Sequence, residues 1–137
     1  MKFLVDANIL SEPTKASPDQ KVVDWLNANE SSLAVDTIVL GELYLGVLVL
    51  PAGRQRAALE RWFDELARTI ACLAWDAAVS RRWAKLVAEL RRKGKAIPIL
   101  DGMIAATALE HGLTVATRNV RDFRHAGVAV VNPFENQ

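Results

Sequence analysis

The stretch Phe3-Leu4-Val5-Asp6-Ala7-Asn8 is the starting point for predicting the fold, because its apolar run ends abruptly at an acid. Such a run indicates a short buried strand, here at 2–6. Further segments with a strand-like pattern lie at 32–36, 69–73, 113–117 and 128–131.

Helical spacing of apolar residues between these strands predicts helices at 19–29, 38–50, 54–67, 77–92 and 101–110. Thr37 is the expected N-cap of the second helix, which Pro51-Ala52-Gly53 ends. The alternation predicts an α/β fold, an α/β/α sandwich with a four- or five-stranded, mainly parallel sheet. Ligands of such folds bind outside the carboxyl ends of the strands, so the residues after each strand are the candidate site residues.

The chain has 137 residues, of which 51% are hydrophobic and 24% charged, so we expect one globular domain, 1–137. Its longest nearly apolar segment, 38–50, is shorter than the roughly 20 residues of a membrane span. The N-terminus lacks the features of a signal peptide. The only cysteine, Cys72, is expected to be a small buried residue in a reducing compartment. A cytoplasmic protein without a membrane segment is predicted.

The formal net charge of +1 is unevenly distributed along the chain. Residues 81–95 contain seven basic side chains and one acid, a net charge of +6, which leaves −5 for the remainder. A basic segment beside an acid-rich remainder can attract a polyanion to one surface and bind cations at another.

Three acids lie where an unpaired carboxylate is costly. Asp6 ends the first predicted strand, while Glu42 and Asp101 are the only charged residues in 38–50 and 99–109. Burying a lone carboxylate costs several kcal/mol unless a cation, hydrogen-bond donors or a proton compensates. Each acid alone also has a structural explanation, since Asp6 and Asp101 could cap helices and Glu42 could pair with an arginine or face solvent.

Asn119 and Asp122 follow the strand at 113–117, where either side chain could close a turn. All these polar residues sit beside apolar elements of a fold that gathers its strand ends in one place. Several carboxylates resist sharing a cleft in ionised form unless a cation is bound. An all-oxygen set of this kind favours magnesium or manganese over zinc.

Four blocks of sequence occur in order along nearly the whole chain: FLVDANILSEP at 3–13, GELYLG at 41–46, DGMIAATA at 101–108, and LTVATRN followed by DF at 113–123. With these blocks at this spacing, the chain resembles the PIN-domain ribonucleases. Within them it is most similar to the VapC-type toxins of VapBC toxin–antitoxin pairs, in the FitB-like subgroup.

The resemblance implies that Asp6, Glu42 and Asp101 form an acidic metal-binding core, with Thr117 and Asn119 at its edge. Asn8, Thr117 and Asp122 are candidate supporting residues. Many relatives have an acid at the position of Asn119, so the resemblance leaves one or two bound ions open, and one ion is favoured. The resemblance also implies a homodimer and a VapB- or FitA-like antitoxin that obstructs the active site.

The predicted activity is metal-dependent hydrolysis of RNA phosphodiester bonds. Asp6 and Asp101 are expected to hold magnesium or manganese, Glu42 to ligate the ion or orient the attacking water, and Asn119 to support the metal shell. Basic residues must hold the RNA around an acidic pocket. The candidates are Arg118, Arg121, Arg91, Arg92 and Lys93. Three tryptophans on apolar stripes are expected to be core or dimer contacts rather than base-stacking surfaces, namely Trp25, Trp62 and Trp83.

Two other interpretations stay open at this point. A catalytically impaired PIN module would bind antitoxin or RNA without cleavage, and Asn119 is its only support. An aspartyl-phosphate phosphatase would use Asp6 as its nucleophile, but it needs a second acid where this chain has Asn8.

Overall fold

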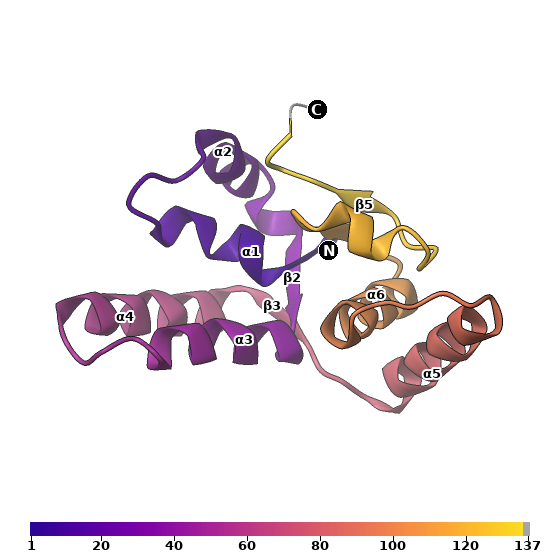
Figure 1. The fold of residues 1–137 in the computed structure, drawn as a ribbon. Helices are drawn as coiled ribbons and strands as arrows, with labels where there is room; N and C mark the ends of the chain where they lie inside the picture. The colour runs from indigo at the N-terminus through magenta and orange to yellow at the C-terminus, as the bar shows by residue number, and fades with distance from the viewer. Residues whose placement is uncertain (136–137) are drawn as a thin grey trace.

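The computed structural model describes residues 1–135 and contains a five-stranded sheet in which all neighbouring strands are parallel (Figure 1). The strands occur in the spatial order β3-β2-β1-β4-β5. Their bounds are β1 (Phe3–Val5), β2 (Leu33–Asp36), β3 (Ala71–Leu73), β4 (Thr114–Ala116) and β5 (Val130–Val131). The predicted α/β class is confirmed, and the sheet has the larger of the two strand numbers expected.

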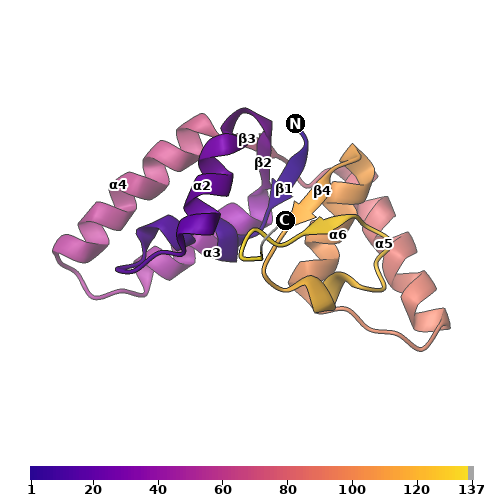
Figure 2. The same cartoon turned by 90° about the horizontal axis from the view of Figure 1, so that it is seen from above.

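Within residues 1–135, six α-helices and three short 3-10 helices connect the strands. The α-helices are α1 (Ala7–Leu10), α2 (Gln20–Ala28), α3 (Thr37–Leu48), α4 (Arg54–Thr69), α5 (Ala77–Arg92) and α6 (Ile99–His111). The 3-10 helices are η1 (Glu12–Thr14), η2 (Glu30–Ser32) and η3 (Val120–Phe123). Figures 1 and 2 show the α3–α4 and α5–α6 pairs at opposite ends of the molecule. Among residues 1–135, no helix is both long enough and apolar enough to span a membrane.

The order of the strands places a switch in chain direction beside β1. The chain moves from β1 outward to β2 and β3, and then returns to add β4 on the opposite side of β1. At such a switch point, the connections after two neighbouring strands diverge and leave a crevice at their carboxyl ends. Val5 pairs with Ala116, so Asp6 and Thr117 leave the sheet side by side at this crevice.

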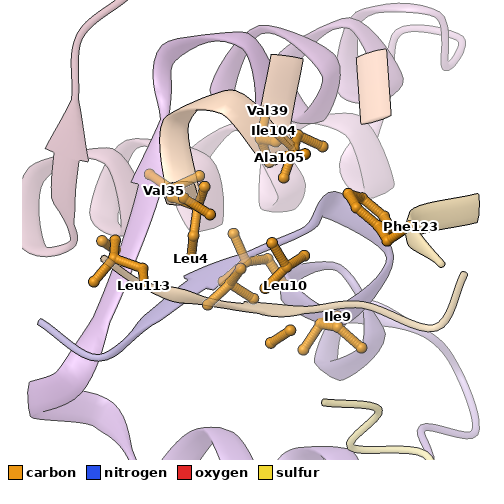
Figure 3. Packing of buried hydrophobic residues seen from close by; sticks show 14 of the residues in the cluster. Leu4, Ile9, Leu10, Val35, Val39, Ile104, Ala105, Leu113 and Phe123 are labelled. Carbon is orange, nitrogen blue, oxygen red and sulfur yellow. The ribbon is translucent and has the colours of Figure 1, made fainter. Parts of the chain in front are cut away.

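The hydrophobic core surrounds β1, as Figure 3 shows. Leu4 and Val5 are fully buried, and Ile104 and Ala105 of α6 lie in the same cluster. Phe123, at the end of η3, is 1% exposed and is the largest fully buried side chain. A central parallel strand is covered on both faces, which explains why its sequence is continuously apolar rather than alternating. The core thereby holds β1, and the residues that follow it, in a rigid setting.

The start of α3 differs from the prediction. Asp36, not Thr37, is the N-cap: its Oδ1 accepts a hydrogen bond of 2.8 Å from the backbone N–H of Val39. Thr37 is already the first helical residue. Aspartate caps a helix at least as well as threonine, so an acid at a strand end can perform both tasks.

The expected burial of Cys72 is wrong, and the apolar helix predicted at 38–50 is only partly buried. Cys72 is exposed, because β3 is an edge strand with a neighbour on one side only. The apolar helix predicted at 38–50 ends at Leu48 and is buried along one face, where Leu43 and Val47 contact the core. On its other side Leu45 is 61% exposed. The apolar composition of this helix therefore exceeds what the monomer's own core requires.

Candidate active site

A hollow of about 470 Å³ lies at the carboxyl ends of the central strands and is lined by most of the predicted site residues. Asp6 precedes α1, Asn8 lies within α1, and Asn119 precedes η3. Glu42 comes from the middle of α3 and Asp101 from the first turn of α6. Four separate segments thus bring their oxygen atoms to one cleft, as the strand-end argument predicts.

A hydrogen-bond network fixes the Asp6 carboxylate. Its Oδ1 accepts from the Ala7 N–H at 2.7 Å, and its Oδ2 accepts from the Thr117 hydroxyl at 2.8 Å. The Asn8 amide also donates to Oδ2, at 3.3 Å. The Thr117 hydroxyl in turn accepts from the Asn119 N–H at 3.0 Å. These bonds join the segments after β1 and β4 and hold Asp6 in one orientation.

The elements that carry Glu42 and Asp101 explain where these acids sit. The Asp36 cap fixes the beginning of α3, and Glu42 follows less than two turns later. Asp101 lies in the first turn of α6, where a negative charge interacts favourably with the unpaired backbone N–H groups. Both carboxyl groups are half-buried.

The cleft disfavours ionised carboxyl groups. Burial, followed by the charges of Asp6 and Asp36, raises the pKa of Glu42. Burial and the charges of Asp6 and Asp122 raise the pKa of Asp101 to about 6. A hydrogen bond between the carboxyl groups of Asp101 and Asp122 acts in the same direction, because it requires a proton on one of them. A bound cation would remove this penalty.

The donor set fits a hard divalent cation. Oε1 of Glu42 is buried, and no atom of residues 1–135 makes a hydrogen bond to it. The side chains that line the hollow offer only carboxylate and amide oxygens as ligands, which suits magnesium or manganese. Within the described residues, no three His, Cys, Asp or Glu side chains already stand close enough together to enclose an ion. Mutual repulsion of carboxylates gives a physical reason for this spacing.

The remaining candidate residues lie around the cleft rather than in it. Thr117 is buried behind Asp6, while Arg121 is exposed on η3. The Arg118 guanidinium lies 4.4 Å from the centre of the Phe134 ring. Lys93 pairs with Glu89 at 3.2 Å. Arg91 lines the hollow between α5 and the start of α6, which shares Pro98 and Ile99 with the cleft. Lys93 lines a different hollow, beside His125 and Ala126.

Asp36 is a further buried acid beside the site. The sequence pattern of lone charges in apolar segments does not identify it. Its side chain is 1% exposed, and burial together with the charge of Asp6 raises its pKa. A signal was present in the sequence, since Asp36 ends β2 just as Asp6 follows β1. An acid at the start of a helix is already explained as an N-cap, so the sequence alone does not mark Asp36 as a site residue.

Comparison with known proteins identifies the family to which the chain belongs. The family model of the PIN domain matches residues 3–129. The chain belongs to the PIN-domain family. This PIN-domain chain is 38% identical to the VapC ribonuclease Y4jK of Sinorhizobium fredii over 97% of its own length and 98% of that protein. It is 35% identical to the toxin FitB of Neisseria gonorrhoeae, covering 98% and 99% of the two chains.

Solved structures agree with these relatives. The PIN-domain chain superimposes with a TM-score of 0.93 on a chain of the FitAB complex bound to a DNA fragment, at 33% identity. The match covers 98% of this chain and 97% of that one. The chain is therefore a member of the VapC ribonuclease toxins of type II toxin–antitoxin systems, as the sequence blocks indicated.

Proposed function

We propose that this PIN-domain chain is an endoribonuclease that hydrolyses RNA phosphodiester bonds with magnesium or manganese. The observation that carries the proposal is the convergence of Asp6, Glu42 and Asp101 on one cleft, in which a buried Glu42 oxygen accepts no hydrogen bond from residues 1–135. The names of its relatives, which include ribonucleases, support the same activity.

Each site residue has a distinct part in this proposal. Asp6 and Asp101 would hold the divalent ion, with Glu42 as a third ligand or as the group that orients the attacking water. When bound, the ion supplies charge neutralisation at the phosphoryl oxygens and lowers the pKa of a coordinated water. Thr117 and Asn8 hold the Asp6 carboxylate by donating to its Oδ2, which leaves it less free to turn away from the cleft.

One ion fits this donor set better than two. Asn119 contributes a neutral amide where a carboxylate would favour a second cation. Asp122 raises the pKa of Asp101 and does not line the hollow. We propose that Asn119 supports the shell of a single ion, directly or through water.

An antitoxin and a second copy of the chain are the proposed protein partners. Three large apolar side chains of α3 are exposed, namely Tyr44, Leu45 and Leu48, and Val49 follows them. Contiguous exposed apolar residues of this kind favour a protein interface. Their helix also carries Glu42, so a partner bound there would lie close to the active site. Solved neighbours of the chain include the toxin–antitoxin complexes FitAB and VapBC.

Cleavage of total RNA by the purified chain tests the activity. We expect cleavage with magnesium or manganese, none with EDTA, and none by Asp6→Asn. The matched control is Asp64→Asn, which removes an exposed carboxylate on α4 and should leave cleavage unchanged. Cleavage that resists the chelator, or an active Asp6→Asn protein, would refute the metal-nuclease assignment. RNA binding without cleavage under every metal condition would instead identify a catalytically impaired module.

A further inference from the structure

A second hollow, of about 170 Å³, lies between α5 and the beginning of α6. Its walls are apolar and include Trp83, Val87 and Leu90 from α5, with Ile97 from the segment that leads into α6 and Ile99 at the start of α6. The cations Arg91 and Lys95 complete its lining. We refer to it as the Trp83 hollow. It is smaller than the roughly 300 Å³ of typical drug-sized sites, so it suits a single flat ring system.

The Trp83 hollow adjoins the acidic cleft. Pro98 and Ile99 line both cavities, and Asp101 follows them on α6. Ile99 is 73% exposed, so no other part of the described chain covers the boundary between the two. A polymer whose phosphate lies at Asp101 could therefore place an adjoining group in the Trp83 hollow.

Gly102 lies against Ile97 and the indole of Trp83 at the start of α6. A Cβ atom at this position would stand 3.3 Å from Cγ2 of Ile97 and 3.6 Å from Nε1 of Trp83. The residue next to Asp101 thus helps to form the floor of the hollow. Within residues 1–135, the indole N–H of Trp83 makes no hydrogen bond, which leaves a donor for a ligand.

The charges around the Trp83 hollow identify its occupant. An apolar protein side chain would gain nothing from two exposed cations, whereas a nucleotide has a flat base for the apolar walls and a phosphate for Arg91 and Lys95. We propose that the Trp83 hollow binds one base of the RNA next to the cleaved phosphodiester. This inference rests on the proposed ribonuclease function and adds a subsite to it. Trp83 then acts as more than the core or dimer contact expected from its apolar stripe.

A binding experiment with abasic RNA tests this subsite. The parent protein is Asp101→Asn, which keeps the shape of the site while preventing cleavage. The probes are a series of fluorescent single-stranded RNAs that differ in the place of one abasic nucleotide. Their affinity is measured by fluorescence anisotropy in the presence of magnesium. We expect one abasic position to weaken binding about tenfold, as the loss of a stacked base does.

The variants are chosen so that the base and the hollow can be compared directly. Adding Trp83→Leu should weaken binding of intact RNA about tenfold and remove the sensitivity to that abasic position. Trp83→Phe keeps a ring and should retain the sensitivity. Ile99→Ser changes an exposed side chain and serves if Trp83→Leu does not fold; it should reduce the sensitivity. Lys95→Gln should reduce the slope of log affinity against log salt concentration by about one, whereas Arg61→Gln on distant α4 should leave that slope unchanged.

The outcomes separate this inference from the proposed function. If the wild-type chain cleaves RNA but Trp83→Leu and Ile99→Ser keep full sensitivity to the abasic position, the subsite is wrong and the ribonuclease assignment stands. If binding shows no sensitive position, the subsite is also wrong. If the wild-type chain neither binds nor cleaves RNA, the proposed function fails, and the subsite fails with it.

Discussion

The carboxyl group of Asp101 is expected to weaken the folded protein at neutral pH when no divalent cation is bound. Its pKa is about 6, against an ordinary value of 3.8, because of burial and the charges of Asp6 and Asp122. The folded chain therefore holds this proton more tightly than the unfolded chain does. The resulting stabilisation is complete below a pH of about 4 and is lost as the pH rises through about 6. Asp101→Asn cannot ionise and should escape this loss.

The magnitude follows from the size of the shift. A change of about two pKa units corresponds to about 3 kcal/mol in the free energy of unfolding. Asp101 is only half-buried, so solvent screening reduces this to about 1–2 kcal/mol. Removing a negative charge from the first turn of α6 costs about 0.3–1 kcal/mol in the opposite direction. We therefore expect Asp101→Asn to be more stable than wild type by about 1 kcal/mol at neutral pH.

Urea unfolding in the presence of a chelator measures this difference. The gain should appear at a pH of about 7 and vanish as the pH falls to about 4, because the Asp101 carboxyl of the folded chain is then protonated. Asp64→Asn, at an exposed carboxylate, should show no gain at either pH. Magnesium should reverse the order, because it stabilises the wild type by about 2.7 kcal/mol at a hundred times its dissociation constant. A variant that is no more stable than wild type at neutral pH in chelator would refute the electrostatic reasoning.

Three further perturbations test other parts of the structure. Thr117→Val removes the hydroxyl that donates to Asp6 and should reduce magnesium affinity about 10- to 100-fold in a calorimetric titration, with Thr117→Ser restoring it. Phe123→Ala empties a fully buried position and should lower the free energy of unfolding by about 3–5 kcal/mol in urea; a loss below about 1 kcal/mol would contradict the packing. Leu45→Glu on the exposed face of α3 should change stability by less than about 0.5 kcal/mol but alter the oligomeric state in light scattering. An unchanged assembly would exclude that face from the dimer interface.

The fold could be predicted from the sequence because each element carries its own pattern. The apolar run at β1 and the helical stripe of α5 are local signals that survive packing unchanged. Ends of elements depend on contacts with the rest of the molecule, so the predicted strand at 113–117 shortens to Thr114–Ala116. Exposure depends on spatial order, and no local pattern shows that Cys72 lies in an edge strand.

The site could be predicted in part because charge is rare in the elements that carry it. Glu42 and Asp101 are conspicuous in apolar helices, and the strand-end rule predicts that Asp6 lies near them. Asp36 and the Trp83 hollow could not be found in this way. Asp36 has an ordinary explanation as a helix cap, and the hollow arises only when Trp83 and Gly102 meet between two helices.

The topology explains why one cleft can hold acids that are so far apart in the chain. Returning from β3 to place β4 beside β1 brings the segment after Ala116 to the segment after Val5, and α6, which leads into β4, carries Asp101 to the same edge. The carboxyl groups of Asp6, Glu42 and Asp101 therefore converge. Their repulsion lowers the stability of the folded chain unless protons or a cation neutralise the charge. A fold without a functional use for that charge would gain about 1 kcal/mol from the single change Asp101→Asn. This cost gives a physical reason for the proposal that the cleft binds a cation.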